Sequence, residues 1–374
     1  MATTTANQPQ PQRIFITGAS GYIGSRVIAE LLPPPSSSSP SPSTQYVVRG
    51  LSRSEAGSAK LRALGATPVS GTLASLDILR AEAARADVVV HLADAWIDDF
   101  SQPYENVIRI DGKAVDALME GLADIKSESE GERKKKKKLF IGTSGVGVVA
   151  PDAQGGETDE TAPANPSPMN GRIHCERHIL QQASSVAAQG GKGGVISVAV
   201  MRLPPFVYGR GGSGVRLFMD IFAKLGYVAR VGDGEAKTSV VHVDDAARAY
   251  VRAIVRHTAT AAAGTKGEKG DGEKELYNVT ASTQVTFRDF TDAIAATLRL
   301  PVREMDFEEA AATAGPLVAG FFSDRIRGNS GKARRELGWI PSEVGIVEDI
   351  REGSYVQVMK EMEAAAAAAA GGQA

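Results

Sequence analysis

Short apolar runs alternate with helical patterns in the first part of the chain. Runs rich in β-branched residues lie at Arg13–Thr17, Tyr46–Leu51, Asp87–Leu92, Leu139–Thr143 and Val195–Arg202. Apolar positions with helical spacing lie between them, at Tyr22–Leu32, Glu55–Leu64, Leu76–Ala86, Tyr104–Leu122 and Arg172–Ala187. Continuous apolar runs are typical of strands buried on both faces of a parallel sheet. The order therefore predicts an α/β fold with a doubly wound parallel sheet of the Rossmann type.

After Arg202 the pattern changes to short strands mixed with helices. The strands expected here are Tyr227–Val231, Val240–Val243, Leu276–Val279 and Val302–Phe307. The helices expected are Val215–Leu225, Asp244–Arg256, Phe287–Leu298 and Gly331–Leu337, the third with a capping box of Thr286 and Asp289. We expect a Rossmann domain of residues 13–203 and 238–257, and a smaller mixed C-terminal domain of residues 204–237 and 275–362.

Polar and low-complexity tracts interrupt these elements. They lie at residues 1–12, 33–44, 126–138, 187–194, 257–274 and 364–374. Such tracts cannot bury enough apolar surface to offset the entropy of the chain, so we expect flexible loops, with flexible tails at 1–12 and 363–374. The lysine run Lys134–Lys138 is interpreted as a solvated loop extension, with a nuclear signal or a phosphate-binding patch as the alternatives.

Composition narrows the class of protein. The chain of 374 residues has 42 Lys and Arg against 44 Asp and Glu, so its charge gives no reason to expect nucleic acid or an anionic membrane as partner. No window reaches the roughly 18 consecutive apolar residues of a membrane span, and residues 1–12 lack the apolar core of a secretory signal. The single cysteine excludes an intrachain disulfide. We expect a cytoplasmic protein with a small-molecule substrate, and a homodimer is compatible with the sequence.

A glycine-rich turn follows the first predicted strand directly. Residues 17–24 read TGASGYIG, with the spacing G-x-x-G-x-x-G before a predicted helix. In this context Gly18 allows the tight turn, Gly21 lets the backbone approach a pyrophosphate, and Gly24 lets the helix pack against the strand. The turn predicts dinucleotide binding. The contacts expected from it are Gly18, Ser20, Gly21, Tyr22, Ile23 and Gly24.

The end of the second strand bears on which dinucleotide is bound. An acidic residue there would hydrogen-bond the ribose 2′-hydroxyl of NAD, whereas an arginine accommodates the 2′-phosphate of NADP. The chain has Ser52 and Arg53 at this place. We therefore expect NADP as cofactor, with NAD as the alternative.

Several motifs together resemble the extended short-chain dehydrogenases/reductases, the NAD(P)-dependent epimerase/dehydratase family, over residues 13–360. These are TGASGYIG at 17–24, VVVHLA at 88–93, LFIGTSG at 139–145, MRLPPFVYG at 201–209, VVHVDDAARAY at 240–250 and KARRELGWIP at 332–341. The resemblance implies a Rossmann-type cofactor domain and a small C-terminal substrate domain. It also implies cofactor contacts at Leu92 and Ala93 on the adenosine side, at Thr143 and Ser144 near the nicotinamide ribose, and at Pro204, Phe206 and Val207 near the nicotinamide ring.

The resemblance fails at the residues that carry the chemistry. In that family a Tyr-x-x-x-Lys pair lies on the helix after the fifth strand, but residues 167–176 read SPMNGRIHCE here. One alignment places Pro168 and Arg172 at the two positions, and another places Asn170 and His174 there. The sequence is therefore identified as an atypical member that keeps the cofactor-binding motif and lacks the usual pair.

Candidates for the missing groups lie in the same segment. His174 titrates in the right range to protonate a substrate oxygen, with a surface histidine as the plainer interpretation. Arg172 cannot shuttle protons near neutral pH but can hold the cofactor ribose or a substrate anion. Thr143 and Ser144 at the end of the fifth strand complete the catalytic candidates. His174 and His178 have the spacing of metal ligands, but no third ligand is evident and no metal is expected.

Three functions are compatible with these residues. The favoured one is an NAD(P)(H)-dependent oxidoreductase acting on a carbonyl or hydroxyl group of a small metabolite. The alternatives are a nucleotide-sugar epimerase or dehydratase and a non-catalytic NADP-binding sensor. Enzymatic activity is thus expected but not required by the sequence.

Overall fold

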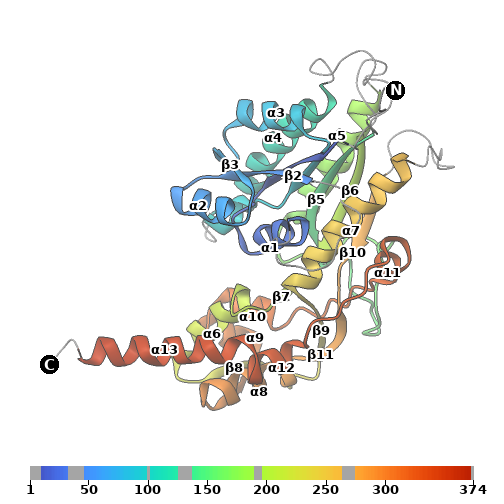
Figure 1. Ribbon diagram of the computed structural model, residues 1–374. Coiled ribbons are helices and arrows are strands. Elements are labelled where there is room, and N and C mark those ends of the chain that lie inside the picture. Colours follow the sequence, from blue (N-terminus) through green and yellow to red (C-terminus); the bar gives the residue numbers. More distant parts are fainter. Residues whose placement is uncertain are drawn as a thin grey trace, which may run out of the picture. The chain divides into compact units, whose positions relative to one another are not determined.

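The computed structural model describes residues 10–32, 46–98, 102–124, 137–188, 196–262 and 274–371 (Figure 1). The chain forms two compact units. The first consists of Met1–Thr143, His174–Val200 and Ala253–Glu275, and the second of Ser144–Ile173, Met201–Arg252 and Leu276–Ala374.

The second unit includes a segment that the sequence pattern assigns to the first. Residues 144–173 belong to it because their backbone pairs with residues far along the chain. Thr158 N donates to Arg327 O at 2.9 Å, and Asn329 N donates to Thr158 O at 2.7 Å. Such pairing over a long sequence separation leaves no local signal in the amino-acid pattern.

A seven-stranded sheet of the order β10-β6-β5-β4-β1-β2-β3 is present among the described residues. Its strands are β1 (Gln12–Thr17), β2 (Tyr46–Ser52), β3 (Thr67–Ser70), β4 (Val88–His91), β5 (Lys138–Gly145), β6 (Ile196–Leu203) and β10 (Lys274–Asn278). The pairs β1–β2, β2–β3, β1–β4 and β4–β5 are parallel. The strand order reverses between β1 and β4, which is where doubly wound sheets bind their ligands. The predicted Rossmann-type fold is confirmed.

The helices of the first unit match the apolar periodicity. They are α1 (Tyr22–Leu31), α2 (Glu55–Ala63), α3 (Leu76–Arg85), α4 (Tyr104–Ala123) and α5 (Arg172–Ala188). The apolar runs are buried as predicted, since Val88, Val89 and Val90 of β4 have no exposed surface. The pattern misses β3, a short strand that contains Pro68. Proline is tolerated there because β3 is the edge strand of the sheet.

The second unit is the mixed α/β part. Its strands are β7 (Phe206–Tyr208), β9 (Lys237–His242) and β11 (Ser282–Thr286) in one sheet, and β8 (Val228–Val231) with β12 (Val302–Met305) in another. Strand β9 is parallel to β7 and antiparallel to β11. Its helices include α6 (Ser213–Leu225), α8 (Phe287–Leu298), α9 (Phe307–Thr313), α10 (Pro316–Phe321), α11 (Gly331–Leu337) and α12 (Ile346–Glu352). The predicted capping box of Thr286 and Asp289 is confirmed at the start of α8.

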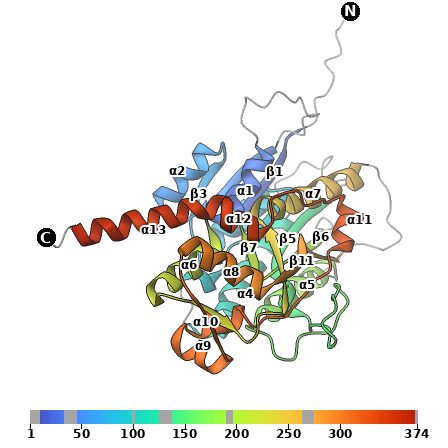
Figure 2. The ribbon, with the colours of Figure 1, turned by 90° about the horizontal axis from the view of Figure 1, so that it is seen from below.

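Phenylalanine rings fill the core of the second unit. Helices α6, α8 and α10, which surround this core, lie together in Figure 2. Phe206 is 2% exposed, and its ring centroid lies 4.8 Å from that of Phe290 in an edge-to-face contact. Four further rings lie within 6.3 Å of it, those of Phe218, Phe287, Phe321 and Phe322. Strand β7 and helices α6, α8 and α10 thus pack around one apolar core.

Three tracts differ from their expected loop structure. Helix α13 (Ser354–Gly371) continues through the alanine tract that was expected as a tail, because alanine has the highest helix propensity. Helix α7 (Val243–Ala262) likewise extends into the tract after residue 256. Lys138 is 1% exposed at the start of β5, and its Nζ donates to Ala84 O at 3.4 Å. It is therefore not a solvated loop residue, whereas Lys134–Lys136 lie outside the described residues.

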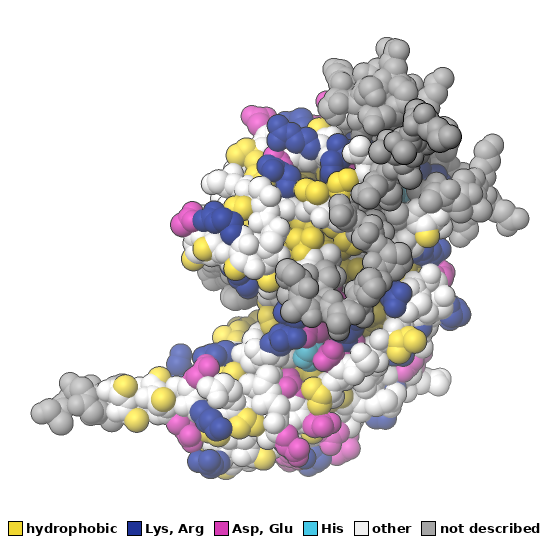
Figure 3. Space-filling model, in the orientation of Figure 1, with side chains coloured by type: hydrophobic (Ala, Val, Ile, Leu, Met, Phe, Trp, Pro, Cys, Tyr) yellow, Lys and Arg dark blue, Asp and Glu magenta, His cyan; other side chains and the backbone are white. Residues whose placement is uncertain are grey.

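The distribution of charged side chains on the surface agrees with the near-neutral net charge of the chain. Basic and acidic side chains are interspersed over the face drawn in Figure 3. In the part of the chain that the structure describes, no helix combines the length and apolar character needed to cross a membrane.

Candidate functional site

The glycine-rich turn between β1 and α1 has the geometry that its sequence predicts. Gly18 has a φ of +68°, and a Cβ atom there would lie 2.7 Å from the backbone nitrogen of Ala93. A Cβ on Gly24 would lie 2.3 Å from Gly18 O. A Cβ on Gly21 would meet only Gly18, at 3.0 Å from its oxygen. Gly18 and Gly24 are thus required by packing, whereas the side of Gly21 is open for the approach of a ligand.

The start of α1 is suited to an anion. Its N-cap residue is Gly21, which supplies no capping side chain, and its first turn contains no acidic residue. Neither the N-cap residue nor the first turn of α1 therefore compensates the partial positive charge of the helix N-terminus. A phosphate group is the ligand that such a helix end binds in this architecture.

Leu92 and Ala93 lie against this turn, and their contact with a cofactor stays a prediction. Leu92 N donates to Thr17 O at 3.2 Å, and Ala93 N donates to Thr17 Oγ1 at 3.3 Å. The carbonyl carbon of Leu92 and the nitrogen of Ala93 both lie within 3.0 Å of the position of a Gly18 Cβ. The structure thus brings the end of β4 and the glycine-rich turn together.

A buried polar network lies behind the turn. Thr17 Oγ1 is 2.7 Å from His91 Nδ1, and His91 Nε2 is 3.0 Å from Asp111 Oδ1 on α4. All three side chains are at most 2% exposed. Because the carboxylate accepts from Nε2–H, Nδ1 is the acceptor of the Thr17 hydroxyl proton. The network joins β1, β4 and α4. Sequence reasoning missed it, and its only local signal is a histidine at the end of an apolar strand.

Hydroxyl groups surround the start of α2 beside the glycine-rich turn. A Cβ on Gly57 would lie 2.6 Å from Ser52 Oγ and 3.0 Å from Ser20 Oγ. Lys60 Nζ donates to Ser20 O at 3.0 Å. The exposed Arg53 follows β2 directly. The basic residues Arg53 and Lys60 and the hydroxyls of Ser20 and Ser52 thus belong to the region around the end of β2 and the glycine-rich turn. The sequence pattern did not indicate Lys60.

The catalytic candidates at the end of β5, Thr143 and Ser144, differ in their hydrogen bonds. Thr143 Oγ1 donates to the backbone oxygen of His91 at 2.8 Å, so its hydroxyl holds β5 to β4. Ser144 is buried, and its Oγ has no hydrogen-bond partner among the described residues. Arg172 begins α5, where its backbone nitrogen donates to Asn170 Oδ1 at 3.0 Å. The catalytic roles of these residues stay predictions.

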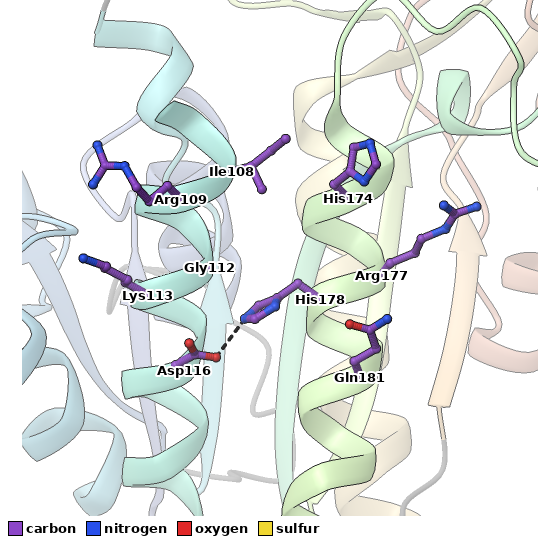
Figure 4. A pocket seen from close by; sticks show the side chains of 9 residues that line it. All are labelled: Ile108, Arg109, Gly112, Lys113, Asp116, His174, Arg177, His178 and Gln181. Atoms are coloured by element: carbon purple, nitrogen blue, oxygen red, sulfur yellow. Dashed lines mark hydrogen bonds and ion pairs between the residues drawn. The ribbon is translucent and has the colours of Figure 1, made fainter. Parts of the chain in front are cut away.

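His174 lies in an open pocket between α4 and α5 (Figure 4). The pocket is lined by Ile108, Arg109, Gly112, Lys113, Asp116, His174, Arg177, His178 and Gln181. His178 extends across it, with its Nε2 2.7 Å from Asp116 Oδ1, whereas His174 is exposed and does not point toward Asp116. His178 thus has a partner of its own. Cys175 between them is buried.

One group of potential metal ligands is present among the described residues, formed by His242, Asp244 and Glu343. Its two carboxylates already bind guanidinium groups, that of Asp244 to Arg210 and that of Glu343 to Arg248. The backbone nitrogen of Asp244 donates to His242 Nδ1 at 3.2 Å. His242 therefore satisfies an amide at the start of α7.

The residues expected near the nicotinamide ring lie on or before β7. Phe206 belongs to the aromatic core described above, and Pro204 is also buried. Their contact with a cofactor stays a prediction, as does that of Val207. The neighbouring Tyr208 donates its hydroxyl to Val344 O at 2.7 Å, and burial raises the pKa of this phenol. Tyr208 is thus held in its neutral form and has a backbone partner.

Asp324 is a titratable group that the sequence did not single out. It lies in the segment between α10 and α11, where its Oδ1 accepts from Ile326 N at 3.1 Å. Burial raises the pKa of this carboxyl to about 6, and the Ile326 amide lowers it in part. A single aspartate in a loop sequence gives no sign of such burial.

Comparison with known proteins agrees with the fold and the glycine-rich turn. The sequence model of the NAD dependent epimerase/dehydratase family matches residues 14–266. An uncharacterized protein of Schizosaccharomyces pombe is 28% identical over 346 residues, which cover 92% of this chain and 99% of that protein. The enzyme 4-hydroxy-2-methyl-3-oxo-4-farnesyl-3,4-dihydroquinoline-1-oxide ketoreductase of Stigmatella aurantiaca is 25% identical over 353 residues, covering 87% and 91%. The crystal structure of UDP-glucose 4-epimerase of Thermotoga maritima with UDP-glucose has a TM-score of 0.63 at 20% identity, covering 94% and 99%.

Proposed function

Because the chain belongs to the NAD dependent epimerase/dehydratase family, we propose that it is an NADP(H)-dependent oxidoreductase acting on a carbonyl or hydroxyl group of a small metabolite. The observation that carries the proposal is the open side of Gly21 at the start of α1. A pyrophosphate fits there because no side chain intervenes and the helix end favours negative charge. The bound dinucleotide would supply or accept the hydride.

The end of β2 supports NADP rather than NAD. Arg53 and Lys60 would hold the 2′-phosphate, with the hydroxyls of Ser20 and Ser52 beside them. The nearest acidic residue in the sequence is Glu55, whose carboxylate pairs with Arg62 on the same helix. A carboxylate engaged in this way is not placed to accept from a ribose hydroxyl. The basic and hydroxyl groups instead match a phosphate.

Replacing Arg53 with Ala is expected to weaken NADPH binding by about ten- to a hundredfold and NADH binding much less. The reason is that one charge-assisted contact is worth roughly 1.5–3 kcal/mol. Dissociation constants for both dinucleotides, measured by fluorescence titration, give the ratio directly. Arg26→Ala, which removes a guanidinium from α1 in the same unit, is the matched control. Equal losses for NADPH and NADH in Arg53→Ala would show that Arg53 does not contact the 2′-phosphate.

The second candidate function is a nucleotide-sugar epimerase or dehydratase. It is favoured by the fold, which is shared with the UDP-glucose 4-epimerase described above. The named activity of the Stigmatella aurantiaca relative, a ketoreductase, favours simple carbonyl reduction. Two assays distinguish these functions. In the first, the protein is incubated with NADPH and a panel of benzaldehyde, acetophenone and diacetyl, and in the second with UDP-glucose. NADPH oxidation by a carbonyl compound supports the oxidoreductase, whereas tight NADPH binding without turnover in either assay supports a sensor.

A further inference from the structure

The open pocket between α4 and α5 lies entirely within the first unit (Figure 4). Its volume is about 480 Å³, which is within the range of small-molecule sites. Side chains four positions apart lie on one face of a helix. Arg109 and Lys113 of α4 therefore lie side by side at the pocket, as do His174 and His178 of α5.

Gly112 leaves the α4 side of this pocket open without being required there by packing. A Cβ atom on Gly112 would lie 3.7 Å from His178 Nε2, which is an ordinary contact. Gly121 of the same helix differs, because a Cβ there would lie 2.2 Å from Arg80 O. Glycine in the middle of a helix is less favourable than alanine, since it orders a freer backbone. Packing of the described residues thus explains Gly121 but not Gly112.

Three cations line the pocket without an ion-pair partner among the described residues. They are Arg109, Lys113 and Arg177. Asp116 is the one carboxylate among the described lining residues, and its Oδ1 already lies 2.7 Å from His178 Nε2. In Figure 4, Arg109 and Lys113 extend from one side of the pocket and Arg177 from the other. The pocket thus carries an excess of positive charge on both of its sides.

This excess is unlike the pairing of other basic side chains in the first unit. Several of its arginines form ion pairs with carboxylates, namely Arg13, Arg49, Arg62, Arg80 and Arg85. Like charges four residues apart on a helix repel each other, so Arg109 and Lys113 destabilise α4 slightly. Glu105, one turn before Arg109, does not line the pocket. No ion pair within the described chain offsets the repulsion, and an anionic ligand would.

The charge pattern favours a small anion over a second copy of the chain. A twofold contact brings the same face of both copies together. It would place the three cations of one copy near those of the other, with Asp116 as the carboxylate of each lining. Guanidinium groups instead bind phosphate or carboxylate groups through paired hydrogen bonds, and an ammonium group binds them as a point charge.

We propose that this pocket binds a small anion with two or more phosphate or carboxylate groups. Arg109 and Arg177 hold anionic groups from opposite sides, and Lys113 adds a third positive charge. Apart from the two imidazoles, no aromatic ring is among the 9 described lining residues, so the anionic groups rather than a base or an apolar ring are recognised. None of the lining residues belongs to the glycine-rich turn or to the end of β2. The inference therefore does not depend on the proposed oxidoreductase function.

Carbon-13 NMR of the histidine rings reads the pocket directly during titration with pyrophosphate and, separately, with citrate. The chain has five histidines, and His174→Gln and His178→Gln assign the two resonances of the pocket. Both resonances are expected to shift in a saturable way with at least one of the two anions, and not with the same concentrations of acetate. Added NaCl is expected to weaken the binding because the cations are exposed. Binding of pyrophosphate alone would assign phosphate groups to the ligand, and binding of citrate alone would assign carboxylates.

Substitutions of charged residues are expected to change the affinity in opposite directions. The double variant Arg109→Gln with Arg177→Gln is expected to raise the dissociation constant about tenfold, since each exposed ion pair contributes up to about a fivefold gain in affinity. Asp116→Asn removes the negative charge and is expected to lower the dissociation constant by up to about fivefold. The matched control, Lys224→Gln with Arg351→Gln, removes two exposed cations from the second unit and is expected to bind as the wild type does.

Each remaining result bears on the inference. The absence of a saturable shift at His174 and His178 with both anions overturns it, as do equal affinities in the arginine double variant and its control. Gly21→Asp is expected to keep both shifts, whereas their loss would assign the bound anion to the dinucleotide turn instead. Sedimentation gives the oligomeric state. A dimer that dissociates in the arginine double variant, together with no anion binding, would assign this face to a second copy of the chain and overturn the inference.

Discussion

Gly21→Asp is expected to abolish measurable NADPH binding while the protein stays folded. A Cβ at this position meets only Gly18, 3.0 Å from its backbone oxygen, so the turn has to shift by a few tenths of an ångström to accept a side chain. The new carboxylate occupies the place of the pyrophosphate and adds a negative charge at the start of α1. Loss of two charge-assisted contacts of roughly 1.5–3 kcal/mol each lowers the affinity by at least about a hundredfold. Fluorescence titration with NADPH measures the loss, and thermal unfolding checks the fold.

Gly345→Asp is the matched control for this experiment. Gly345 is the N-cap of α12 in the second unit, and a Cβ there would meet nothing within 4 Å. The substitution therefore adds the same charge to another helix N-terminus, where aspartate is a favoured cap. It is expected to leave NADPH binding unchanged. If Gly21→Asp bound NADPH as tightly as the wild type, the assignment of the dinucleotide site to this turn would be wrong.

The second large effect concerns stability. Asp111→Ala is expected to lower the free energy of unfolding by about 1.5–3 kcal/mol, the contribution of a buried hydrogen bond to a charged group. The substitution leaves the Nε2–H of His91 without its acceptor in a place where the side chains are at most 2% exposed. It also loosens the contact of His91 with Thr17, from which the glycine-rich turn starts. Urea unfolding followed by circular dichroism measures the change.

The same helix provides a control with the same chemistry. Asp116 Oδ1 lies 2.7 Å from His178 Nε2, but these side chains are 38% and 31% exposed. Water solvates both groups when the pair is broken, so Asp116→Ala is expected to cost at most about 1 kcal/mol. Equal losses for Asp111→Ala and Asp116→Ala would show that burial of the His91 pair contributes nothing to stability.

Several elements of this protein were predicted from its sequence because they depend on local interactions. The turn at 17–24 forms within one strand–helix unit, so the glycine spacing alone predicted both its shape and its ligand class. The helices α1 to α5 and the buried strands β1, β4 and β5 follow from periodicity and continuous apolar runs in the same way. The capping box at Thr286 is another short-range feature, and it was found from two residues.

Only the tertiary structure decided which polar groups lie together. Lys60 reaches the turn at Ser20 from another helix, and His91 meets Asp111 because α4 packs beside β4. Asp324 lies next to Gly147 in the turn after β5, far away in sequence, and burial raises the pKa of its carboxyl. Burial and long-range hydrogen bonds set the chemistry of such groups, and neither is encoded in the residues that flank them. The sequence thus determined the framework and the dinucleotide turn, whereas packing between distant segments decided the partners and the pKa of the groups around them.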